Sequence, residues 1–127
     1  MALVAIVIAI ALIQFIYFSM LVGMARGKYG VDAPATSGDP TFECYHRVQQ
    51  NTLEQLVVFL PAIMMFGMYI RADIAAGIGA VYIIGRFIYL KAYVADPKKR
   101  TVGFMLTFLP NIVLVFGGLY GAVMRVM

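Results

Sequence analysis

The chain has 127 residues, of which 63% are hydrophobic and only 13% are charged, with a formal net charge of +4 at pH 7. Soluble domains are about 45–50% apolar and about 25% charged, and a small fold buries only about two-thirds of the surface of its unfolded chain. The composition therefore excludes a soluble enzyme and a disordered chain, and the single cysteine excludes a disulfide-stapled module. An integral membrane protein remains, and the long apolar runs described below predict that it is all-α. No basic run with interleaved aromatic residues indicates a nucleic-acid partner.

The first apolar segment covers residues 2–25 and is interrupted only by Gln14 and Ser19. About 20 apolar residues are enough to cross a hydrocarbon core of roughly 30 Å as a helix. No basic residue precedes Arg26, so the segment lacks the charged start of a signal peptide and is interpreted as a retained membrane helix. A polar loop then extends to Thr41.

Three further helices are expected after this loop. The second covers residues 42–70 and is polar in its first half; it contains Pro61, which neighbouring helices accommodate in a membrane. The third covers residues 74–94 and begins with Gly and Ala residues that let membrane helices approach closely. The fourth covers residues 101–125. The sequence thus predicts one domain, residues 1–127, built as a membrane four-helix bundle with short connections.

Basic residues gather in two of the three loops. They are Arg26 and Lys28 in the first loop, and Lys91, Lys98, Lys99 and Arg100 in and beside the third. The second loop has only Arg71. Because basic loops stay on the cytoplasmic side, the first and third loops are expected to face the cytoplasm and both termini the opposite side. The short connections favour a bacterial inner membrane.

A polar stripe follows the first half of the second helix. Arg47, Asn51 and Glu54 are spaced i, i+4 and i+7, which places them on one helix face. Ionisable groups cost about 2.5–3.5 kcal/mol each at the centre of a membrane helix, so they are functional candidates by default. His46 is expected beside this face, and it has no partners at metal-ligand spacing, so no metal site is predicted.

A second stripe ends the third helix, with Arg86, Tyr89 and Tyr93 at i, i+3 and i+7. Two interpretations stay open: Arg86 forms a structural contact between helices and the tyrosines an interfacial belt, or all three line a pocket. If the stripes converge, guanidinium groups suit carboxylates, a carboxylate suits an ammonium, and amides suit peptide groups. The expected ligand is then a zwitterionic, peptide-like molecule with more than one carboxylate.

Two runs of the sequence are familiar as motifs. The run from Phe42 to Glu54 (FECYHRVQQNTLE) resembles the second-helix motif of the MAPEG family, the membrane-associated proteins of eicosanoid and glutathione metabolism. The run from Arg86 to Tyr93, followed by Arg100, resembles the end of that family's third helix and the start of its fourth. The similarity is greatest to the branch of microsomal glutathione transferases and leukotriene C4 synthase, and it extends over nearly the whole chain.

The resemblance implies a homotrimer that binds glutathione as co-substrate between neighbouring subunits, without a metal. It implies glutathione-binding roles for Arg26, Arg47, Gln49, Asn51, Glu54, Tyr89 and Tyr93. It also implies a catalytic role for Arg100 beside the sulfur. A free thiol with a pKa near 8.5 is mostly protonated at neutral pH, and a nearby cation favours the thiolate that attacks electrophiles.

The expected function is therefore a membrane-bound glutathione transferase of detoxification that acts on lipophilic electrophiles, with reduction of lipid hydroperoxides as a second activity. One alternative is a non-catalytic protein of the same fold that binds or presents a lipid. A small four-span drug/proton antiporter is disfavoured, because the first helix carries no carboxylate. Three features depart from the family pattern. Gln55 stands where relatives often have Tyr, and Gly27 where some have a second Arg. The Pro that commonly stands three residues after the motif's Glu is absent, and the nearest is Pro61.

Overall fold

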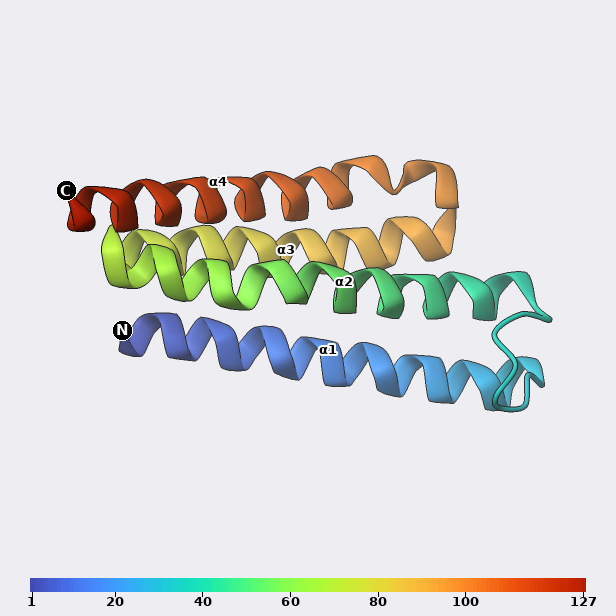
Figure 1. Cartoon of the computed structure of the whole chain (residues 1–127). Coiled ribbons are helices and arrows are strands. Elements are labelled where there is room, and N and C mark those ends of the chain that lie inside the picture. Colours follow the sequence, from blue (N-terminus) through green and yellow to red (C-terminus); the bar gives the residue numbers. More distant parts are fainter.

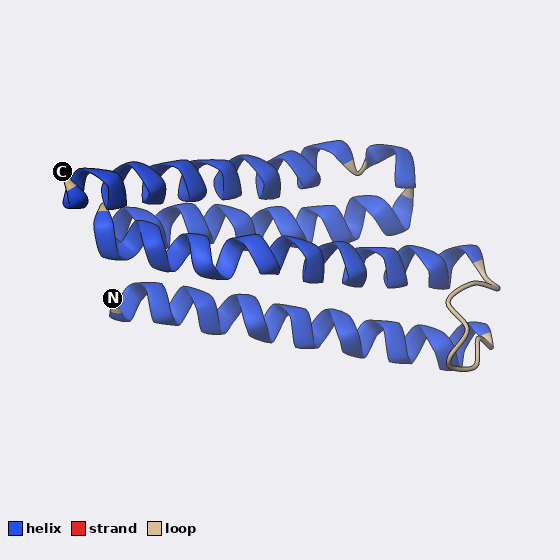
Figure 2. Ribbon diagram, viewed as in Figure 1, coloured by secondary structure: helices blue, strands red, loops and turns tan.

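In the computed structural model, which describes all 127 residues, four long helices lie side by side along a common direction (Figure 1). They are α1 (Ala2–Tyr29), α2 (Pro40–Tyr69), α3 (Ala72–Ala95) and α4 (Thr101–Val126), with a short 3₁₀ turn, η1 (Pro97–Lys99), before α4. Figure 2 shows helices and loops only. All four helices are long and apolar enough to cross a membrane. The expected all-helical class and its four apolar spans are confirmed.

Several helix ends differ from the expected bounds by one to four residues, and two of these differences have clear local reasons. The first helix continues one turn beyond residue 25, to Tyr29, where Gly30 adopts a left-handed conformation with φ 69° and donates its N–H to the carbonyl of Arg26. This is a common way for helices to end. The second begins at Pro40, because the Asp39 carboxylate accepts the N–H groups of the first turn and proline suits the first helical position.

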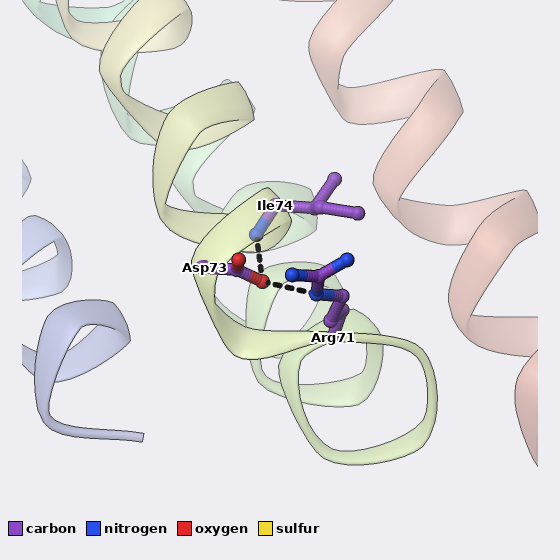
Figure 3. A network of polar contacts seen from close by, with 3 residues as sticks. All are labelled: Arg71, Asp73 and Ile74. Atoms are coloured by element: carbon purple, nitrogen blue, oxygen red, sulfur yellow. Dashed lines mark hydrogen bonds and ion pairs between the residues drawn. The ribbon is translucent and has the colours of Figure 1, made fainter.

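The turn between α2 and α3 carries a small polar network (Figure 3). Arg71 Nε lies 2.9 Å from Asp73 Oδ1, which also accepts the N–H of Ile74 at 2.9 Å. The two charged side chains are 66% and 52% exposed, so the ion pair contributes only about 0–1 kcal/mol. The turn therefore owes its position mainly to the packing of the two helices that it joins.

Two glycines allow α3 and α4 to approach each other closely. A Cβ on Gly103 would come within 2.4 Å of the backbone nitrogen of Tyr89, and one on Gly85 within 2.7 Å of Leu106 Cβ. Small residues at helix contacts are typical of membrane bundles. The contact at Gly103 places the start of α4 directly against the part of α3 that carries the predicted tyrosines.

The two ends of the bundle differ in content. Both termini and the α2–α3 turn lie at one end, whereas the α1–α2 loop and the α3–α4 connection lie together at the other, which we call the loop end (Figure 1). Between them, large apolar side chains are exposed along all four helices. So much exposed apolar surface is typical of a face that contacts lipid or another protein. The two polar stripes predicted from the sequence both approach the loop end.

Candidate binding site at the loop end of the bundle

A cavity of about 960 Å³ opens at the loop end, at the upper end of the roughly 300–1,000 Å³ range of ligand pockets. Its walls come from the α1–α2 loop, the first half of α2, the last part of α3 and the start of α4. The lining residues are Thr36, Ser37, Glu43, His46, Arg47, Gln50, Asn51, Glu54, Tyr89, Tyr93, Arg100 and Phe104. Most of them are polar or charged, which is unusual for a surface beside the membrane.

Six of the eight predicted site residues line this one cavity. They are Arg47, Asn51 and Glu54 from α2, Tyr89 and Tyr93 from α3, and Arg100 directly before α4. The stripes on α2 and α3 therefore converge through Tyr89 and Tyr93, whereas Arg86, which the second interpretation also placed in the pocket, does not line the cavity. The close approach of α3 and α4 at Gly103 brings the start of α4, with Phe104, beside Tyr89 of the same cavity.

The charges in the cavity do not neutralise one another. Arg47 and Arg100 supply two guanidinium groups, and Glu43 and Glu54 supply two carboxylates. No ion pair joins any of them, since the chain's single ion pair is the one at the α2–α3 turn. Both signs are thus available to a ligand that itself carries both.

Arg100 is held in place by the short η1 turn. Asp96 accepts the N–H of Lys98 at 3.1 Å and so caps the turn, and Arg100 Nη1 donates to the carbonyl of Pro97 at 2.8 Å. One donor of the guanidinium is used by this loop, and the others are free to face the cavity. In the same cavity, the rings of Tyr89 and Tyr93 lie with their centroids 5.5 Å apart.

Two predicted residues do not line the cavity of this chain. Arg26 Nη1 donates to the carbonyl of Ala35 at 2.7 Å, and its guanidinium lies 4.9 Å from the ring centroid of Phe42. Gln49 faces α1, where its Nε2 donates to Ser19 Oγ at 3.0 Å. Both lie at the loop end, but neither reaches the cavity wall.

The structure also adds residues that the sequence reasoning did not select. His46 lines the cavity, although we expected it beside the functional face, and Glu43 and Gln50 join it there. Glu43, Arg47, Gln50 and Glu54 follow helical spacing, so a wider helical face would have found them. Thr36 and Ser37 come from a loop and carried no such signal. No group of three or more His, Cys, Asp or Glu side chains is placed to hold a metal ion.

Comparison with known proteins identifies the family of the chain. The MAPEG family model matches residues 3–120. This chain belongs to the MAPEG family. It is 45% identical over 115 residues to a protein of Synechocystis sp. named "Uncharacterized protein sll1147", covering 91% of this chain and 84% of that relative. Microsomal glutathione S-transferase 2 of Homo sapiens is 43% identical over 91 residues, which cover 72% of this chain and 62% of the human protein.

Leukotriene C4 synthase of Bos taurus is a further relative, 33% identical over 99 residues, which cover 78% of this chain and 66% of the bovine enzyme. The family resemblance inferred from the two motifs is thus confirmed. The match to the human transferase spans slightly less than two-thirds of that protein. Together, MAPEG membership and four apolar helices make this chain an integral, multi-pass membrane protein.

One departure from the MAPEG pattern has a structural explanation. Gln55, where relatives often have Tyr, does not line the cavity; its Oε1 accepts a hydrogen bond from Asn111 Nδ2 at 3.0 Å. This bond joins α2 to α4 within the apolar part of the bundle, beside Pro110 in α4. In this chain the position after Glu54 therefore links helices.

Proposed function

We propose that this MAPEG protein is a membrane-bound glutathione transferase that conjugates the glutathione thiolate to lipophilic electrophiles. The observation that supports the proposal is the single cavity in which Arg47, Arg100 and Glu54 are all free of ion pairs. Glutathione carries two carboxylates, an ammonium, two peptide groups and a thiol, so it matches this mixture of charges. Two of the relatives, which are named as a glutathione S-transferase and a leukotriene C4 synthase, favour the same chemistry.

In the proposed complex, the charged groups of the α2 face bind the ends of the tripeptide. Arg47 binds a carboxylate, since a guanidinium forms paired hydrogen bonds with that group. Glu54 binds the ammonium, and the amide of Asn51 binds a peptide or carboxylate oxygen. Tyr89 and Tyr93 of α3 line the same cavity. With these contacts the thiol of the central residue lies toward Arg100.

Arg100 is the proposed catalytic residue, because its fixed positive charge stabilises the thiolate. A thiol with a pKa near 8.5 is mostly protonated at neutral pH, and a neighbouring cation lowers that pKa. The proton leaves to water, and the thiolate attacks an electrophile that arrives from the lipid. The same thiolate would also reduce a lipid hydroperoxide to an alcohol, with a second glutathione completing the disulfide and water as the other product.

The protein is proposed to work as a homotrimer in a bacterial inner membrane. The loop end would face the cytoplasm, where glutathione is dissolved, as the basic residues of the first and third loops favour. Arg26 and Gln49, which lie outside the cavity of their own chain, would meet the glutathione held by a neighbouring copy. Light scattering of the detergent-purified protein is expected to give a protein mass of three times 14.0 kDa. A mass of 14.0 kDa at working concentrations would contradict the trimer.

The transferase proposal is tested with the purified protein in detergent. Addition of glutathione near neutral pH is expected to raise the ultraviolet absorbance of a thiolate, and a generic aromatic electrophile is expected to be consumed in proportion to protein. S-Methylglutathione, which has no thiol to ionise, is the matched control and should bind without the absorbance change. A protein that gives neither thiolate nor turnover is not a transferase.

A further inference from the structure

Arg86 lies in α3 with none of its surface exposed, and it connects three helices. Its Nε donates to Thr107 Oγ1 of α4 at 2.9 Å, and its Nη1 donates to Asn51 Oδ1 at 2.9 Å and to Thr52 Oγ1 at 3.1 Å, both on α2. All three acceptors are neutral, and no carboxylate pairs with the guanidinium. A buried cation without a counter-ion is costly in a membrane bundle, so it calls for a role beyond joining helices.

The two threonine hydroxyls fix the orientation of this guanidinium. Thr52 Oγ1 donates its proton to the carbonyl of Val48 at 2.7 Å, and Thr107 Oγ1 donates to the carbonyl of Gly103 at 3.2 Å. Each hydroxyl has one proton, so only its lone pairs remain for Arg86. Arg86 is therefore the donor in each of its hydrogen bonds, and neither threonine hydroxyl can donate to it in return.

Arg86 also fixes which atom of the Asn51 amide faces it. An amide has one oxygen that accepts and one nitrogen that donates, whereas a guanidinium only donates. Asn51 must therefore turn its oxygen to Arg86, as observed, because the flipped amide would set two donors against each other. Its Nδ2 makes no hydrogen bond within the chain, and Asn51 lines the cavity. The cavity consequently offers an N–H donor at this point.

Arg86 also lies behind a second lining residue. The carbon of its guanidinium is 4.3 Å from the ring centroid of Tyr89, a cation–π distance. Arg86 itself is not part of the cavity wall. It contacts the two lining residues from behind and can reach a ligand only through them.

We propose that Arg86 is a positioning residue that locks the amide of Asn51, so that the cavity selects a ligand group with a carbonyl or carboxylate oxygen at this point. For the identity of the ligand this inference rests on the proposed function. In glutathione the matching groups are the peptide carbonyls and the carboxylates. The ammonium and the peptide N–H groups are mismatched there and are expected to bind elsewhere in the cavity.

The polarity of the site is tested with two variants of Asn51 and titration of glutathione by calorimetry. Asn51→Asp keeps an oxygen for Arg86 but turns a second oxygen toward the ligand, whereas Asn51→Ala removes both groups. Because two acceptors repel each other, Asn51→Asp is expected to bind glutathione at least about tenfold more weakly than the wild type and more weakly than Asn51→Ala. If Asn51→Asp binds more tightly than Asn51→Ala, the ligand group is a donor and the proposal is wrong.

The role of Arg86 is tested by a double-mutant cycle. Arg86→Met is expected to raise the KM for glutathione about tenfold with less than a twofold change in kcat, and Arg86→Lys to restore part of the loss. In the Asn51→Ala background, Arg86→Met is expected to change KM less than twofold, since the amide that it positions is gone. A purely structural role would give equal losses in both backgrounds, which would overturn the proposal.

A milder variant covers the case in which Arg86→Met does not fold. Thr107→Val keeps Arg86 and the side-chain volume but removes the acceptor of Nε, and it is expected to raise KM less than Arg86→Met would. This increase, too, should vanish in the Asn51→Ala background; if it persists there, Arg86 does not act through Asn51. A wild-type protein that binds no glutathione overturns the proposed function and this inference together, whereas binding with additive effects overturns only the role of Arg86.

Discussion

Replacement of Arg100 by alanine is expected to lower the turnover of glutathione with an electrophile by about 10²–10³-fold, the usual effect of removing one group that stabilises a reacting anion. Arg100 is the lining guanidinium that the η1 turn holds at the start of α4. Without its charge the bound thiol keeps the proton that it has in water. The absorbance of the thiolate should disappear at neutral pH and return only at alkaline pH.

Lys99→Ala is the matched control for this experiment. Lys99 is the preceding residue and carries the same charge in the same short connection, but it does not line the cavity. Its loss should leave the thiolate signal and kcat within about twofold of the wild type, as for most surface substitutions. If Arg100→Ala retained a full thiolate signal, another group would have to activate the sulfur.

Much of the fold could be predicted because long apolar runs in the sequence indicate membrane helices. The spans at residues 2–25 and 101–125 follow directly from such runs. The exact ends could not be predicted so well, since they depend on local hydrogen bonds: the carboxylate of Asp39 begins α2, and the left-handed Gly30 ends α1. The sequence also did not show which residues bring α3 and α4 together, because Gly85 meets Leu106 and Gly103 meets Tyr89 only in the folded bundle.

The site residues also fall into those that could be predicted from one stretch of sequence and those that depend on tertiary packing. Arg47 and Glu54 could be selected because one helix repeats every 3.6 residues, so a single stretch of sequence shows which side chains share a face. Thr36 and Phe104 could not, because their place in the cavity wall depends on how a loop and a neighbouring helix pack. For Arg86 both interpretations of the sequence contained part of the answer. It is a buried contact between helices, and the same contact holds Asn51 at the cavity.

Replacement of Arg47 by alanine is expected to weaken glutathione binding about 30-fold or more, while kcat at saturating glutathione changes much less. Arg47 lines the cavity and has no carboxylate partner in the chain, so its guanidinium is free to bind a carboxylate of the ligand. A hydrogen bond to a charged group contributes about 1.5–3 kcal/mol, and each 1.4 kcal/mol corresponds to a tenfold change in Kd. Calorimetric titration with glutathione measures the effect.

Two further variants separate the charge of Arg47 from its shape. Arg47→Lys keeps the charge but loses the planar, two-pronged contact with a carboxylate, so its Kd is expected to lie between those of the wild type and Arg47→Ala. Arg71→Ala removes an exposed arginine at the opposite end of the bundle, where it pairs with Asp73, and should leave binding unchanged. Normal binding by Arg47→Ala would show that the tripeptide lies elsewhere. A loss by Arg71→Ala of similar size would instead mean that overall charge, and not this cavity, attracts the ligand.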